Sequence, residues 1–185
     1  MVVLIIGILA AVALPQYKKV VEKVYLSNAV ARVEAIKKQV DLYMLEYGGI
    51  PSGSITFIGD PMSDSQEKGE LSVDVTAGLS CADVHCYDGR YSYNASGWGG
   101  RIDIRASRMV KPESIKDELM AAYGWDKLPY GLQLVSFAPM IHMYFYNGTW
   151  KKECNPFLSY SGERNKMALY LCKQLPNDWE LSDEF

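Results

Sequence analysis

The stretch MVVLIIGILAAVAL, residues 1–14, decides how the rest of the chain can be arranged. None of its fourteen side chains carries a charge or a conventional hydrogen-bonding group. Leu, Ile, Met and Ala suit a helix, and a helix of this length would be about 21 Å long at about 1.5 Å per residue. The hydrocarbon core of a bilayer is roughly 30 Å thick and takes about 20 residues to cross. The stretch is therefore too apolar for a water-exposed surface and slightly too short for a membrane span.

Three interpretations of this stretch compete. A signal-peptide core has this length, but no basic region precedes it, and the PQYK that follows is a poor cleavage site. A buried strand or helix of a protein core is also apolar, but the residues that follow continue the helical pattern directly. The third interpretation is a membrane and assembly helix whose first few residues are not in the sequence.

Residues 17–47 have the periodicity of an amphipathic helix. Apolar side chains recur three or four positions apart, namely Leu26, Ala29, Val30, Val33, Ile36, Val40, Tyr43, Met44 and Tyr47. Gly48, Gly49 and Pro51 then end the pattern. The sequence predicts one long helix with an apolar segment (1–15) and an amphipathic segment (16–49), followed by a globular, β-rich head (50–185). A coiled coil is the alternative for the second segment, but it would need a longer heptad run.

The head is predicted to contain an antiparallel sheet of about four strands. Alternating or apolar runs mark candidate strands at residues 55–58, 71–75, 90–94, 100–106, 130–137 and 140–146. Residues 96–99 are predicted to join two of them as a hairpin, 51–69 to form a loop, 112–123 a short helix and 164–172 a helical turn or two. The acidic tail is expected to be mobile. Packing the apolar face of the sheet on the helical stripe gives an α+β fold.

The first residues resemble a known family. VVLIIGILAAVALPQY, residues 2–17, looks like the N-terminal helix of type IV pilins and the related pseudopilins. Gly7, Pro15, Gln16 and Tyr17 fall where that family has its glycine and its proline-glutamine-tyrosine. The family's leader peptide, processing glycine and early glutamate are not in the sequence. About seven residues in front would complete the pattern and lengthen the apolar run to roughly 21, which matches a bilayer.

Gly7 and Pro15 weaken the apolar segment as a helix. Proline removes one backbone hydrogen bond and costs roughly 3 kcal/mol in an ordinary helix, and glycine costs about 1 kcal/mol. A simple kink, which is common in membrane helices, is one interpretation. The resemblance implies a second, because the segment between the two residues unwinds in pilus filaments. Gly7 to Pro15 is therefore expected to be at least partly non-helical in a filament.

Four cysteines, Cys81, Cys86, Cys154 and Cys172, favour disulfides in an oxidising compartment. Three pairings are possible, and sequence proximity favours Cys81–Cys86 and Cys154–Cys172. A zinc site is the alternative, although the spacings are not those of a zinc ribbon or finger. The loop between Cys154 and Cys172 resembles the C-terminal disulfide loop of many type IV pilins. Pseudopilins of secretion systems more often lack that loop, so it favours a pilus.

Little in the sequence points to catalysis. The net charge of −3 and pI near 5.4 give no reason to expect nucleic acid as a partner. His85 and His142 are far apart in sequence, and His142 is expected to be a packed residue of an apolar strand rather than a base. No nucleophile motif, phosphate loop or metal-ligand spacing is present, so neither an enzyme nor a cofactor is predicted. Asn94 and Asn147 match the short glycosylation pattern.

The resemblance implies a structural subunit of a type IV pilus-like surface filament. Such a chain would be held in the inner membrane before assembly, be handled by pilus assembly machinery, and polymerise with itself into an extracellular fimbrium. The alternatives are a pseudopilin of a type II secretion system and a membrane-anchored monomeric adhesin or binding domain. A third alternative, an enzyme with an unusually apolar N-terminus, has no support from any motif.

Overall fold

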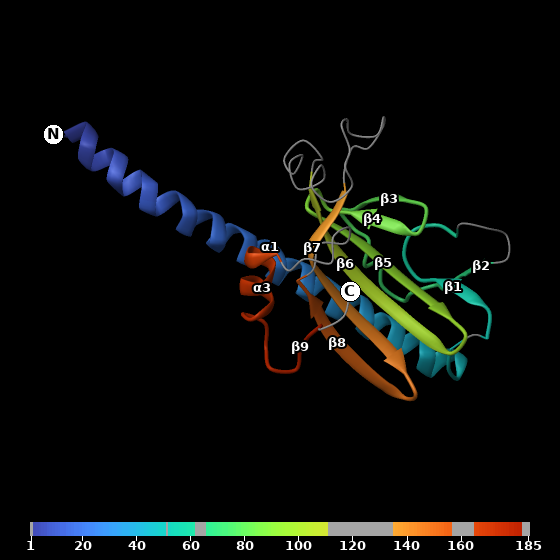
Figure 1. The fold of residues 1–185 in the computed structure, drawn as a ribbon. Coiled ribbons are helices and arrows are strands. Elements are labelled where there is room, and N and C mark those ends of the chain that lie inside the picture. The colour runs from blue at the N-terminus through green and yellow to red at the C-terminus, as the bar shows by residue number, and fades with distance from the viewer. Residues whose placement is uncertain (1, 51, 62–65, 111–134, 157–164, 183–185) are drawn as a thin grey trace, which may run out of the picture.

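The computed structural model describes residues 2–50, 52–61, 66–110, 135–156 and 165–182. One long helix lies against one face of a β-sheet, and its N-terminal part projects beyond the sheet (Figure 1). A short helix and the last strand lie near the point where the long helix leaves the sheet. The chain is thus an α+β structure with a protruding helical arm.

Helix α1, Val2–Tyr47, is continuous through Gly7 and Pro15. Its buried side consists of Leu26, Ala29, Val33, Ile36, Val40 and Tyr43. These positions alternate steps of three and four, so they form one stripe along the helix. The stripe packs on the central strands of the sheet, with which it shares the main hydrophobic core. The helix ends at Gly48 and Gly49, which both have positive φ, as the sequence predicts.

Nine strands form the sheet in the part of the chain that the structure describes. Their bounds are Ser54–Thr56 (β1), Gln66–Lys68 (β2), Ser80–Ala82 (β3), His85–Tyr87 (β4), Tyr91–Trp98 (β5), Arg101–Val110 (β6), Val135–Tyr146 (β7), Thr149–Asn155 (β8) and Glu180–Leu181 (β9). The main order is β2-β1-β5-β6-β7-β8-β9, and the β3–β4 hairpin attaches to β5. Strands β5 to β8 are antiparallel, whereas the edge pairs β1–β2 and β8–β9 are parallel.

The central hairpin is longer than the sequence predicts. Strand β5 extends to Trp98, which pairs with Arg101, so the turn consists of Gly99 and Gly100 rather than residues 96–99. Both glycines have positive φ, which a two-residue hairpin turn of this kind requires. Strand β7 then continues through Ala138 and Pro139, where the register against β6 shifts. The two strands expected on either side of that pair are therefore one.

The C-terminal part is fixed to the sheet by a disulfide. Helix α3, Lys166–Cys172, follows Asn165, whose side chain caps it by accepting a hydrogen bond from the Ala168 amide. Cys172 at its end is bonded to Cys154 of β8. The chain then returns to the sheet through the buried Trp179 and pairs as β9.

The prediction of a strand at residues 71–75 is wrong. The prediction of a mobile C-terminal tail is also wrong as far as residue 182, because the chain there pairs with the sheet as β9. Residues 71–75 are not extended, because Asp74 accepts hydrogen bonds from the amide and hydroxyl of Thr76 and turns the chain. The candidate strand at 55–58 overlaps β1, but β2 lies in the segment predicted as a loop, and strands β3, β4, β8 and β9 were not predicted. The predicted helix at 112–123 and the start of the predicted strand at 130–137 lie outside the described residues.

The predicted fold class is confirmed. A long N-terminal helix, a sheet packed on its apolar stripe and a C-terminal disulfide are all present. The sheet is larger than the expected four strands and is mixed rather than purely antiparallel. The additional strands are short edge elements, whereas the four long strands form its centre.

Candidate assembly surface

The N-terminal part of α1 exposes large apolar side chains that the head does not cover. The exposed fractions of these side chains are Ile6 60%, Val12 63%, Leu14 60%, Tyr17 67%, Val20 61% and Val24 53%. At about 100° per residue, Ile6, Tyr17, Val20 and Val24 lie on one face of the helix, and Val12 and Leu14 lie on either side of that face. We call residues 6–24 the arm. An apolar surface of this kind marks an interaction site rather than a free surface.

Near its C-terminal end, the arm is fixed to the sheet by a partly buried ion pair. Arg108 of β6, whose side chain is 8% exposed, donates from Nε and Nη2 to the two carboxylate oxygens of Glu22, each at 2.9 Å. This two-bond geometry holds both position and orientation. Arg108 also donates to the carbonyl oxygen of Arg90. N-terminal to Glu22, the described α1 side chains are exposed or only partly covered.

Two further polar contacts fix α1 on the β8 side. Lys152 of β8 donates to Glu34 at 2.6 Å and also reaches Asp178 near the C-terminus. The indole nitrogen of Trp150 donates to Asp41 at 2.8 Å. The ammonium group of Lys37 bonds the same Asp41 at 2.7 Å and lies 4.8 Å from the Trp150 ring centre. The helix is therefore tied to the last long strand at two levels.

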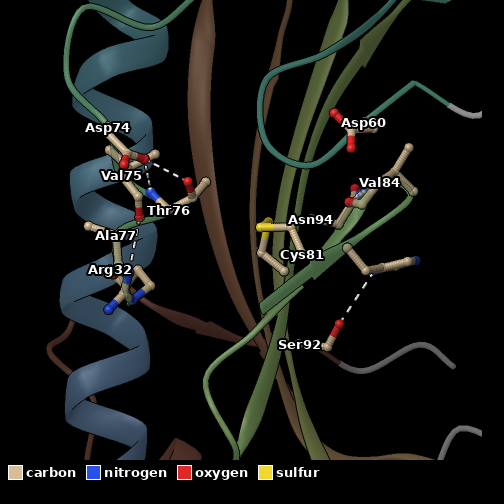
Figure 2. The surroundings of a disulfide bond; sticks show 12 residues. Arg32, Asp60, Asp74, Val75, Thr76, Ala77, Cys81, Val84, Ser92 and Asn94 are labelled. Carbon is tan, nitrogen blue, oxygen red and sulfur yellow. Dashed lines mark hydrogen bonds between the residues drawn. A yellow bond between two sulfur atoms is a disulfide. The ribbon is translucent and has the colours of Figure 1, made fainter. Parts of the chain in front are cut away.

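On the opposite side, α1 is tied to the irregular segment that was predicted as a strand. The guanidinium of Arg32 donates to the backbone oxygens of Val75 and Ala77, at 3.0 and 3.4 Å (Figure 2). Gln39 accepts a hydrogen bond from the Val73 amide at 3.1 Å. These side chains satisfy backbone groups that a strand partner would otherwise have satisfied. Polar contacts on both sides thus fix α1 within the head, and the arm is the part left uncovered.

Gly7 and Pro15 both lie in the arm. The helix passes through them without interruption in this single chain. A Cβ added at Gly7 would meet no atom within 4 Å, so packing in the single chain does not require glycine there. The expected unwinding between them concerns the assembled filament and stays a prediction. Among the described helices, none has a segment both long and apolar enough to span a membrane.

Both cysteine pairs are the ones that sequence proximity favours. Cys81 and Cys86 close the β3–β4 hairpin, and Cys154 and Cys172 join β8 to α3. Of the two asparagines in glycosylation patterns, Asn94 donates its side-chain amide to the Val84 carbonyl, whereas Asn147 is exposed in a turn.

His142 is packed in strand β7, as expected, with its ring centre 5.0 Å from that of Tyr144, and it also has a charged partner that the sequence did not indicate. It lies on the sheet face that points away from α1, with Nε2 2.7 Å from Oδ1 of Asp103. Burial raises the pKa of Asp103, but the hydrogen bonds from His142 and Arg101 outweigh it and hold that pKa well below its usual range. On the same face, donation to Glu153 and partial burial raise the pKa of the Tyr144 hydroxyl to about 12.

These anchors were not identified from the sequence. Glu22 and Arg108 are 86 positions apart, and Glu34 and Lys152 are 118 positions apart. A single sequence does not show which of these distant residues pair. One available signal was that acids and bases occur both on the helix and on the strands that must cover it.

The sequence is similar to known pilins over part of its length. It is 36% identical over 83 residues to a type IV major pilin protein, PilE1, of Neisseria gonorrhoeae, which covers 45% of this chain and 39% of that pilin. A second type IV major pilin protein PilE1 of the same species is 35% identical over 82 residues, covering 44% of this chain and 50% of that pilin. The chain thus spans about two fifths to half of these relatives. No family model matches it, and no solved structure does.

The resemblance to type IV pilins agrees with both the fold and the sequence comparisons. The expected fold elements are present, with the long N-terminal helix at one end and the disulfide near the other. The similarity to two pilins was found without reference to the structure. Sequence similarity, the long helix and the C-terminal disulfide together fit a type IV pilin.

Proposed function

We propose that the chain is a structural subunit of a type IV pilus-like helical filament and assembles through α1. The observation that carries the proposal is the arm, an apolar helical surface that the subunit's own head leaves uncovered. A surface of this kind needs either lipid or protein around it. Side-by-side packing of arms from several subunits would supply protein.

The energetics favour such a bundle. Burial of apolar surface contributes roughly 25 cal/mol per Å², so several hundred Å² per subunit would stabilise the bundle by many kcal/mol before ordering costs. An arm that packs against differently placed subunits makes a heterologous contact. Contacts of that type produce open helical polymers when the rotation does not close.

The same arm would serve the subunit before and after assembly. The arm would lie in the inner membrane before assembly, and pilus assembly machinery would transfer the subunit into an extracellular filament. The disulfides fit an oxidising compartment. The role is structural rather than enzymatic, and the partner is a second copy of the chain rather than nucleic acid.

The experiment is electron cryo-microscopy of filaments sheared from the native cell surface. The expected result is a filament in which this chain repeats, with residues 6–24 packed at the centre and the heads outside. The same map would report whether residues 7–15 are unwound. Filaments that lack the chain, with the chain remaining in the membrane fraction as a monomer, would contradict the proposal and favour a membrane-anchored binding domain.

A further inference from the structure

One end of the sheet carries exposed aromatic and arginine side chains on the face that points away from α1. Trp98 is 76% exposed and Tyr146 is 55% exposed. Trp98 pairs with Arg101 across the β5–β6 hairpin, and the register of β6 against β7 brings Arg101 beside Tyr146. Further along β7 and β6, Tyr144 and Arg105 lie on the same face of the sheet. We call these five residues the aromatic–arginine patch.

The composition of this patch is that of a protein interface. Trp, Tyr and Arg are the residues enriched at the centres of interfaces and among their hot spots. The guanidinium of Arg101 lies 4.9 Å from the Tyr144 ring centre, so the aromatic and cationic groups are already arranged together. The side chains of Arg101 and Arg105 are 44% and 49% exposed. Asp103 between them and Glu153, which accepts a hydrogen bond from Tyr144, offset part of their charge. Lys151 lies opposite Tyr144 on β8 and adds one positive charge, so cations still outnumber carboxylates among these residues.

A second surface of the same chain has the opposite charge. A pocket of about 700 Å³ lies between the segment after β1 and the irregular segment at residues 69–76. Asp60, Glu70 and Asp74 line it together with one lysine, Lys68, which forms an ion pair with Asp60 at 2.8 Å, so Glu70 and Asp74 supply the excess negative charge. Asp60 and Asp74 lie on two sides of this region, near the Cys81 disulfide, in Figure 2. Its apolar lining includes Val73, which is 56% exposed.

We propose that the aromatic–arginine patch of one subunit docks on this acidic pocket of a second copy. The charges are complementary, which favours this partner and its orientation. A pocket of this size falls in the range that holds a drug-sized molecule, so it has room for an indole and a guanidinium. The two surfaces share no residue, so the contact is heterologous and can extend from subunit to subunit. The inference rests on the proposed filament and adds a contact between heads to the contact between arms.

The test is a charge exchange in the full-length chain, expressed in its native cell. Arg105→Glu and Glu70→Lys each place like charges across the contact, and the double variant restores opposite charges. Each single variant is expected to reduce the share of chain in sheared filaments about tenfold, the effect of losing one well-placed contact. The double variant is expected to return to within about twofold of the unmodified chain.

Further variants separate docking from folding. Lys166→Glu makes the same change of charge at an exposed position of α3, away from both surfaces, and is expected to leave the filament yield unchanged. Arg105→Gln and Trp98→Ala remove contacts without adding a charge beside Asp103, and both should lower the yield. Thermal unfolding of every variant shows whether the head is still folded.

Two results would overturn the inference without affecting the proposed function. The first is normal filament yield from both single charge reversals. The second is loss of filaments from folded single variants with no recovery in the double variant, which would mean that these surfaces meet a different partner. If the unmodified chain forms no filaments at all, the proposed function fails, and this inference fails with it.

Discussion

Arg108 shows how one side chain can position the whole helical arm. It is buried on the core side of β6, where the other buried residues, Ile102, Ile104 and Ala106, are apolar, and it bonds both carboxylate oxygens of Glu22. Arg108→Ala would leave Glu22 without its cation at a partly buried site. We expect the free energy of unfolding to fall by about 2 to 3 kcal/mol, below the 3 to 5 kcal/mol typical of fully buried pairs, because Glu22 is 26% exposed.

Urea unfolding in mild detergent, followed by tryptophan fluorescence, measures this effect. The control is the double variant Arg108→Ala with Glu22→Gln, which removes the stranded charge and should recover part of the loss. A double variant that is less stable than Arg108→Ala alone would show that the carboxylate has another partner. In that case the ion pair would not be what fixes the C-terminal end of the arm to the sheet.

Asp103 makes the head sensitive to acid. The pKa of its carboxyl group is held well below the unfolded value of about 4, so the folded state binds fewer protons than the unfolded state. The resulting stabilisation is complete above pH 4 and is lost progressively as the pH falls below it. We expect the difference in stability between the unmodified chain and Asp103→Asn to be larger at pH 7 than at pH 3. Urea unfolding at both pH values checks this, and an equal difference would contradict it.

The two disulfides should differ in their contribution to stability. Cys154 and Cys172 are 18 positions apart, whereas Cys81 and Cys86 are 5 apart. Closing the longer loop removes more entropy from the unfolded chain, about 3 kcal/mol against about 2 kcal/mol in the chain-entropy model. Replacing each pair by alanine and measuring urea unfolding gives the two values. The reverse order would mean that the short β3–β4 hairpin has a larger structural role than its loop length suggests.

Elements differ in how well the sequence predicts them, and the reason is their length and side-chain pattern. Helix α1 repeats its apolar stripe over many turns, so its presence and its end at Gly48 were predictable. Strand β8 was missed because Lys152 occupies a position facing the helix, where it binds Glu34 and interrupts the apolar alternation. Strands β2 to β4 have only three residues each, too few to show a period.

The error at residues 71–75 has a different cause. This segment alternates like a strand, but its backbone is bonded to side chains of α1. Alternation predicts a strand only when a neighbouring strand is available, and the neighbour here is a helix. The same limitation applies to the assembly surface. Its apolar character was evident from the sequence, but only the structure shows where the head stops covering α1.

For the molecule as a whole, folding and the proposed assembly would use different parts of one helix. The head folds around the stripe from Leu26 to Tyr43, and the arm from Ile6 to Val24 contributes little to that core. Substitutions in the two parts should therefore have opposite effects. Ile36→Ala, at a fully buried position, is expected to lower the free energy of unfolding by about 2 to 5 kcal/mol. Val12→Asn, at a position 63% exposed, should change it by less than about 0.5 kcal/mol.

The substitution in the arm, which should barely change the free energy of unfolding, should have a large effect on filament yield. Val12→Asn would place an amide in the apolar bundle of arms, where it would lack the hydrogen bonds that water supplies. We expect it to abolish or strongly reduce filaments while the head stays folded, and we expect the apolar control Val12→Leu to retain them. The two measurements are urea unfolding of the purified chain and the amount of chain in sheared filaments. Normal filaments from Val12→Asn would mean that the arm is not the assembly surface, whatever its exposure in the single chain.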